Sequence, residues 1–163
     1  MQDTFETVLE SNKDKIFRIC RIYAMAPIEP QDLFQEVAYQ IWRSLESFKG
    51  KSSINTWVYR ITLNVCLRAK KKSKKHYEKF SSLESIQFLP SEENQDEDQL
   101  EKFAALRSCI STLKELDKTI VLLHLEELPY REIAEVTGLS DNHIAVKMKR
   151  IRKHLYNCIT STL

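Results

Sequence analysis

The chain has 163 residues, with only two Gly and four Pro, and its charges nearly balance at 25 Lys or Arg against 23 Asp or Glu. So few glycines exclude a glycine-rich phosphate-binding loop, and no apolar run is long enough to span a membrane. Abundant Leu, Ile, Lys and Glu with few helix breakers predict an all-α protein, which we expect to be cytoplasmic, with no direct membrane insertion.

The charges are segregated along the chain. Residues 49–79 hold ten Lys or Arg and a single acidic residue, whereas residues 80–101 hold seven Asp or Glu and no cation. The near-neutral total is therefore a cancellation of two charged segments, and it does not argue against a nucleic-acid partner.

Two amphipathic helices open the chain. The apolar spacing of residues 3–25 predicts the first helix. A turn that contains two prolines ends this helix. In the second, about residues 30–48, apolar residues recur every four positions from Leu33 to Leu45, and Trp42 is expected beside this core. The polar side of the second helix is either a solvated face or a docking surface for a basic partner, and it includes Asp32, Gln35 and Glu36.

The third predicted helix, about residues 54–71, combines aromatic, cationic and amide side chains: Trp57, Tyr59, Arg60, Asn64, Arg68 and Lys71. Rings next to cations suit single-stranded nucleic acid, because bases stack on the rings while the cations hold phosphates. Alternatively, Trp57, Ile61 and Val65, spaced by four, are core residues and the lysines that follow are a solvated tail. These residues alone leave both interpretations open.

After residue 73 the helical periodicity fades into a Ser-rich and acidic stretch. We therefore predict two small helical domains, residues 1–75 and 99–163, joined by a flexible linker, residues 76–98. The second domain opens with helices at 99–113 and 114–126 and contains a helix-turn-helix.

The helix-turn-helix begins with a short amphipathic helix, residues 130–137, preceded by Pro129. Gly138 follows, where a left-handed backbone conformation stops the helix, and Ser140 is placed to cap the next one. In this next helix one apolar stripe recurs at spacings of four, three and four: Ile144, Met148, Ile151 and Leu155.

The other faces of this last helix are strongly basic and carry no acidic residue after Asp141. Asn142 and His143 lie in its first turn, and cations follow on its exposed side. A helix held by one apolar stripe and exposing such residues is built to enter a DNA major groove. The alternative is a basic, solvated helix in an ordinary helical bundle.

Nothing in the sequence indicates an enzyme. The four His are scattered, no nucleophile motif is present, and Asp32 and Glu36 share a helical face with no further metal ligand nearby. We therefore expect no metal, no cofactor and no small-molecule substrate. The four Cys are widely spaced without a C-x-x-C pair, which favours free, buried thiols in a reducing cytoplasm.

Three motifs occur in a set order: DLFQEV at residues 32–37, FKG at 48–50 followed by TWVYRITLN at 56–64, and LPYREIA at 128–134. In this order and spacing they resemble the bacterial RNA polymerase sigma factors of the extracytoplasmic-function group. The resemblance covers both predicted domains. It implies a region 2-like domain at 1–75, a region 4-like domain at 99–163, and a protein that directs core RNA polymerase to promoter DNA.

The resemblance also implies roles for individual residues. The helix bearing Asp32, Gln35 and Glu36 would bind core RNA polymerase. The block around Asn64, including Trp57, Tyr59, Arg60, Arg68 and Lys71, would recognise and melt the minus-ten element, with one base flipped into a pocket near Asn64. The last helix would read the minus-thirty-five element as duplex DNA. An anti-sigma factor is the expected regulator.

The recognition helix departs from the family pattern at two positions. Ala145 and Val146 stand where the family often has a basic and a small hydroxyl residue, although their methyl groups could contact thymine methyls. We therefore expect the minus-thirty-five contacts to fall to Asn142, His143, Val146, Lys149 and Arg150 on bases, and to Lys147 and Arg152 on phosphates.

A free-standing helix-turn-helix regulator is the main alternative to a sigma factor. Such a regulator has no need for a polar docking helix followed by an aromatic and basic block, and it would usually dimerise on a palindrome. An interaction protein that only mimics these surfaces would have no use for the phosphate-binding cations of the last helix.

Overall fold

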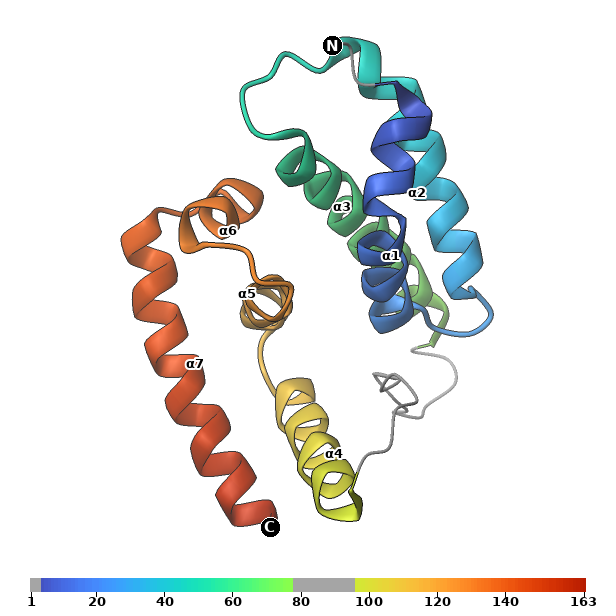
Figure 1. Ribbon diagram of the computed structural model, residues 1–163. Helices are drawn as coiled ribbons and strands as arrows, with labels where there is room; N and C mark the ends of the chain where they lie inside the picture. The colour runs from blue at the N-terminus through green and yellow to red at the C-terminus, as the bar shows by residue number, and fades with distance from the viewer. Residues whose placement is uncertain (1–3, 78–95) are drawn as a thin grey trace. The chain divides into compact units, whose positions relative to one another are not determined.

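The structure is a computed structural model that describes residues 4–77 and 96–163. Within these ranges the secondary structure is entirely helical, which confirms the all-α fold class. The described helices belong to two compact units, α1–α3 and α4–α7 (Figure 1). Most of the predicted linker, residues 78–95, lies outside the described residues, so the predicted domain boundaries remain predictions.

The first unit is a three-helix bundle of α1 (Phe5–Tyr23), α2 (Pro30–Ser44) and α3 (Ile54–Tyr77), with a short 3-10 helix (Leu45–Ser47) after α2. Each of the three helices packs against the other two. Apolar residues spaced by three and four point inward because that spacing repeats once per helical turn. The centre of the core consists of Val8, Ile16, Ile19, Cys20, Leu33, Val37, Ile41, Val58, Leu63 and Cys66.

Local side chains set where α2 and α3 begin. The Glu29 N–H donates to the Asp32 carboxylate at 3.0 Å, which forms half of a capping box, and Pro30 opens α2. The Ser53 hydroxyl accepts a hydrogen bond from the Thr56 N–H at 3.1 Å, so Ser53 caps α3. Each cap pairs backbone N–H groups that have no partner inside the helix.

The second unit consists of α4 (Glu97–Ser111), α5 (Glu115–Leu125), α6 (Tyr130–Thr137) and α7 (Asp141–Thr162). The long α7 packs against α4, α5 and α6, and α5 also packs against α6. The centre of this core consists of Ile110, Ile120, Leu123, Ile133, Ala134, Ile144, Met148 and Ile151. Helix α7 therefore packs against every other helix of this unit.

The prediction that all four cysteines are free thiols is wrong for two of them. Cys109 on α4 and Cys158 on α7 form a disulfide, although 49 positions separate them in the sequence. Cys20 and Cys66 are free and buried, as predicted. The sequence spacing gave no sign of the pairing because the fold of α4 against α7 creates it.

The turn after α5 holds a residue under backbone strain. Glu127 has a φ of 63°, and the Leu128 N–H donates to the Leu123 carbonyl at 3.1 Å across it. This is the helix-ending geometry in which glycine is favoured, because a side chain destabilises the left-handed conformation by about 1 kcal/mol.

Replacing Glu127 by Gly is therefore expected to stabilise the second unit by about 1 kcal/mol, or roughly 4–8 °C in Tm for a unit of this size. Glu126→Gly is the matched control, because Glu126 has a φ of −80° that any residue adopts. There the added backbone freedom should lower the Tm instead. Thermal melting of the two variants gives the comparison, and equal shifts would show that Glu127 is unstrained.

Candidate nucleic-acid interface

The turn between α6 and α7 has the geometry of a helix-turn-helix. Gly138 ends α6 with a φ of 76°, and its N–H donates to the Ala134 carbonyl at 2.8 Å. Two residues later the Ser140 hydroxyl accepts from the His143 N–H at 3.2 Å and caps α7. The left-handed glycine and the serine cap together fix where α6 stops and α7 starts.

The apolar stripe of α7 is buried where the sequence predicted it. Ile144, Met148 and Ile151 are each at most 3% exposed, whereas Leu155 is half-buried. The face opposite this stripe is exposed and carries four residues at spacings of four, three and four: Asn142, Val146, Lys149 and Lys153. Because that spacing keeps side chains on one helical face, these residues are presented together.

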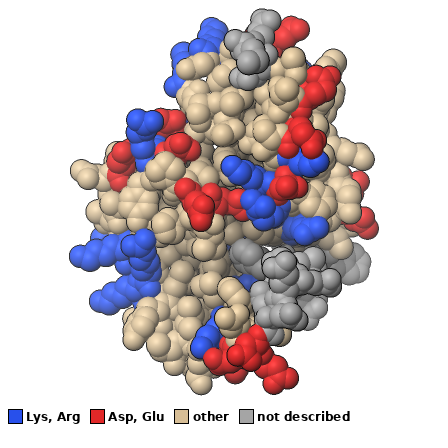
Figure 2. Space-filling model, viewed as in Figure 1, with Lys and Arg blue, Asp and Glu red and all other residues tan. Residues whose placement is uncertain are grey.

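His143 and Arg150 are also exposed and flank this outward face. Figure 2 shows Lys and Arg side chains gathered along α7. Lys153 was not among the predicted DNA contacts, although its register with Lys149 could have identified it. The outward face of α7 therefore combines an amide, a methyl-bearing side chain and three cations, which are the groups that read bases and hold phosphates.

Two of the predicted DNA contacts on α7 are directed toward α5. Lys147 Nζ lies 3.0 Å from Asp117 Oδ1, and both side chains are less than a quarter exposed. Arg152 Nη2 lies 3.4 Å from His124 Nε2. The Lys147 ion pair helps to hold α7 on α5, so the structure does not favour Lys147 as a leading phosphate contact. Arg152 is exposed, and its phosphate contact stays a prediction.

A second stripe of polar and cationic residues runs along α3. Four residues at spacings of four, four and three are all exposed: Arg60, Asn64, Arg68 and Lys71. The opposite face of the helix is buried, including Val58, Leu63 and Cys66. The core keeps α3 fixed, so this stripe is held as one rigid surface on which an amide stands between cations.

The aromatic residues of α3 differ from one another. Trp57 is half-buried and lies against Phe48, with ring centroids 5.1 Å apart. Tyr59 is only 3% exposed, and Lys15 Nζ lies 6.0 Å from its ring centroid. The prediction that Tyr59 contacts DNA is not supported, because a base cannot stack on a ring that is packed into the core.

The outward face of α2 holds the predicted polymerase-binding residues. Asp32, Gln35 and Glu36 are all exposed, and Glu36 Oε1 accepts a hydrogen bond from Gln40 Nε2 at 2.8 Å. Asp32 already accepts the N-terminal hydrogen bond that opens α2. Its carboxylate therefore also has a structural role at the start of α2.

The same face of α2 also carries two exposed aromatic rings. Tyr39 and Trp42 are 50% and 60% exposed, and their ring centroids lie 6.1 Å apart. The expectation that Trp42 lies beside the core is wrong, because Leu33, Val37 and Ile41 already fill that side of α2. Large apolar rings left in solvent beside polar groups are typical of a protein-binding surface.

Across the described residues, no cluster of three or more His, Cys, Asp or Glu could hold a metal ion. In the same part of the chain, no helix is both long and apolar enough to cross a membrane. The exposed faces of α2, α3 and α7 carry groups that suit binding, and the polar and cationic faces of α3 and α7 suit nucleic acid.

Family models match both units. The model for Sigma-70 region 2 matches residues 8–76, and the model for Sigma-70 region 4 matches residues 103–155.

Two curated proteins of Bacillus subtilis (strain 168) are similar over most of their length. The ECF RNA polymerase sigma factor SigW is 25% identical, over 94% of this chain and 88% of its own. The RNA polymerase sigma factor SigV is 26% identical, over 90% and 86%.

Two solved structures share the fold. The sigma factor RpoE, in complex with the anti-sigma factor NepR from Bartonella quintana, has a TM-score of 0.76 at 17% identity and covers 96% of each chain. CnrH, in complex with the cytosolic domain of CnrY, has a TM-score of 0.67 at 18% identity, over 96% of this chain and 88% of its own.

Proposed function

The chain belongs to the Sigma-70 family, in its extracytoplasmic-function group, and from this membership we propose that it binds core RNA polymerase and directs it to promoters through two DNA-reading helices. In this role the protein performs no chemistry itself, because polymerase makes the RNA. Polymerase works in the cytoplasm, so the protein acts there. The observation that carries the proposal is the pair of exposed polar stripes, one on α3 and one on α7, each fixed by a buried apolar stripe behind it.

We assign the minus-thirty-five element to α7. A helix with an exposed N-terminal turn and a polar outward face fits the major groove of duplex DNA. Asn142, His143 and Val146 would meet base edges, with the Val146 methyls suited to thymine, and Lys149 and Arg150 would extend this contact. Lys153 and Arg152 would hold phosphates, whereas Lys147 would contribute mainly by bracing α7 against α5 through its ion pair with Asp117.

We assign the minus-ten element to α3. Asn64 offers both a donor and an acceptor to the edge of an unpaired base, and Arg60, Arg68 and Lys71 lie in register with it to hold the strand by its phosphates. The exposed part of Trp57 would provide a surface for stacking next to the melted strand. Because the described part of α3 is one continuous helix, base reading and strand holding would occur along a single line.

The outward face of α2 is assigned to polymerase. Gln35, Glu36 and the Tyr39–Trp42 pair present acceptors and apolar rings together, a combination that suits a basic and partly apolar surface. One carboxylate oxygen of Asp32 caps α2, and the other would contact polymerase.

Replacing Trp42 by Ala is expected to weaken binding to core polymerase about tenfold or more, since exposed aromatic anchors carry much of an interface's energy. Thermal stability should change little, because the ring is mainly in solvent. Tyr156→Ala is the matched control, because Tyr156 is also an exposed aromatic residue but lies on α7, away from this face. Fluorescence anisotropy with labelled protein gives both affinities. Equal affinities of the wild type and Trp42→Ala would show that this face of α2 does not bind polymerase.

An anti-sigma protein is a further proposed partner. One solved structure of similar fold is a sigma factor in complex with the anti-sigma factor NepR, and the other is CnrH in complex with the cytosolic domain of CnrY. A protein that covers the stripes of α3 and α7 would block both DNA elements at once.

The function is tested by duplex binding with and without core polymerase. A sigma factor should give a sequence-specific, heparin-resistant complex only when core polymerase is present. A free-standing regulator should bind its duplex site alone, and that result would overturn the proposal. A Lys149→Ala, Arg150→Ala double variant serves as the control for specific contact, because it should lose the complex while still associating with core polymerase.

A further inference from the structure

The four cysteines form two pairs with opposite properties. Cys20 and Cys66, on α1 and α3, are fully buried and remain thiols. Cys109 is 1% exposed, but its partner Cys158 on α7 is only half-buried, and these two are joined. One pair is therefore sealed in a core, while the other includes Cys158, which is partly exposed.

The disulfide joins α4 to the second half of α7, where no residue is fully buried. The buried residues of α7 all lie in its first half, and the last of them is Ile151. Of residues 152–163, all of which are described, none is buried. On α4 the buried residues are Ala105, Cys109 and Ile110. Few apolar contacts would hold α4 against the second half of α7 if the bond were absent.

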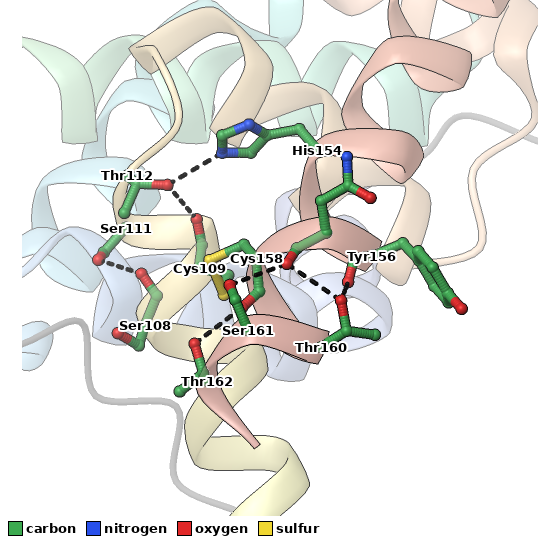
Figure 3. Close-up of a disulfide and its surroundings, with 11 residues drawn as sticks. Ser108, Cys109, Ser111, Thr112, His154, Tyr156, Cys158, Thr160, Ser161 and Thr162 are labelled. Carbon is green, nitrogen blue, oxygen red and sulfur yellow. Dashed lines mark hydrogen bonds between the residues drawn. A yellow bond between two sulfur atoms is a disulfide. The ribbon is translucent and has the colours of Figure 1, made fainter.

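One polar contact supports the same junction. The Thr112 hydroxyl lies 3.2 Å from His154 Nε2 and also donates to the Cys109 carbonyl at 2.7 Å. Figure 3 shows this contact on the His154 side of the disulfide, one helical turn before Cys158. Because Thr112 and His154 are largely solvent-accessible, their hydrogen bond alone adds little. The disulfide is therefore the main link between α4 and α7 at this end of the unit.

We propose that Cys109–Cys158 is a reversible redox link that sets how firmly α4 is fastened to the recognition helix α7. Disulfides in cytoplasmic proteins are usually transient, and a pair with one partly exposed cysteine can both form and break. The chemistry holds whether or not the chain is a sigma factor. The consequence for promoter recognition rests on the proposed function.

The oxidant is a low-molecular-weight disulfide. The Cys158 thiolate attacks one sulfur of this disulfide, which forms a mixed disulfide and releases one small thiolate. The Cys109 thiolate then attacks the Cys158 sulfur, forms the link and releases the second small thiolate. The two protons lost by the protein thiols end on the two released thiols, so two protein thiols are oxidised and one small disulfide is reduced.

The core pair is a built-in control. The hydrogen bond with Cys20, together with burial, raises the pKa of the Cys66 thiol far above its usual range. A thiol that does not ionise is a poor nucleophile, and no solvent path reaches it. Redox buffers that act on Cys158 should therefore leave Cys20 and Cys66 unchanged.

Forming the link should stabilise the second unit and leave the first unchanged. Cross-linking residues 49 positions apart removes much of the freedom of the unfolded chain. For a unit of this size we expect a rise of about 10–30 °C in its melting temperature. Since the outward face of α7 does not include Cys158, the oxidised and reduced forms should present the same DNA-reading residues until the reduced form begins to melt.

The test equilibrates the full chain in buffers of graded ratios of reduced to oxidised glutathione. Mass spectrometry after native alkylation should show Cys109 and Cys158 losing their thiols together, with Cys20 and Cys66 unmodified throughout. In the reduced form, amide exchange should be about tenfold or more faster in α4 and residues 152–163, and unchanged in α1–α3. Cys158→Ser should give the reduced pattern at every ratio.

Three outcomes would overturn the proposal: thiols at Cys109 and Cys158 that persist in oxidised glutathione, a stable mixed disulfide on Cys158 as the end product, or equal exchange rates in the two forms. The wild-type titration needs no variant, so a misfolded Cys158→Ser protein would not obscure it. None of these readouts involves transcription, so failure of the proposed function would leave the result intact.

Discussion

Replacing Ile144 by Ala is expected to lower the free energy of unfolding of the α4–α7 unit by about 3–4 kcal/mol, because a fully buried Ile loses both its transfer energy and its packing. Ile144 is 0% exposed and is the first member of the stripe that fixes α7. A helical unit this small has about 5 kcal/mol of stability to lose. Melting should show the Tm of the second unit lowered by roughly 12–32 °C, with minus-thirty-five recognition weakened accordingly.

Val146→Ala is the matched control for Ile144→Ala. Val146 lies two residues away on the opposite face of α7 and is 50% exposed. Its truncation should change stability by no more than about 0.5 kcal/mol, while it removes methyl groups assigned to DNA. The two variants therefore separate loss of folding from loss of base reading. Equal melting of Ile144→Ala and Val146→Ala would show that the buried stripe does not hold α7 in place.

Replacing Lys71 by Glu is expected to reduce promoter melting about tenfold or more, because it both removes a phosphate contact and adds repulsion of the strand. Lys71 lies in register with Arg60, Asn64 and Arg68 on the exposed stripe of α3. Permanganate reactivity of unpaired thymines measures the melting directly. Binding to core polymerase should not change, since α2 carries that surface.

Lys72→Glu tests whether position or charge alone decides the effect of Lys71→Glu. Lys72 is also exposed, but the next residue on a helix points about 100° away, so it lies off the stripe. The two variants have the same net charge and differ only in the position of the substituted residue on α3. A loss of similar size in both would mean that α3 acts through diffuse attraction and has no defined strand-binding line.

The parts of the fold that local side chains determine were predicted well from the sequence. The helix-turn-helix illustrates this, because Gly138 and Ser140 each act on backbone within a few residues of themselves. The first short helix was predicted at residues 130–137, and α6 spans Tyr130–Thr137. The stripe from Ile144 to Ile151 could be predicted because helical periodicity is also local.

The features that depend on tertiary packing could not be predicted from periodicity. The partners of Cys109 and Lys147 come from helices distant in sequence, so the disulfide and the ion pair with Asp117 appear only in the folded unit. Trp42 and Tyr59 were misjudged for a related reason. A residue type indicates whether a ring can bind a partner, but the neighbouring helices decide whether the ring is exposed.

The most direct test of a sigma-factor function is run-off transcription with purified core polymerase on fragmented genomic DNA, followed by mapping of the new transcript starts. We expect transcripts only when the protein is present, with two shared sequence blocks at a fixed separation upstream of their starts. Arg150→Ala should relax the sequence of the upstream block alone, and Asn64→Ala that of the downstream block alone. A single palindromic block, or transcripts that do not depend on the protein, would contradict the function proposed for α3 and α7.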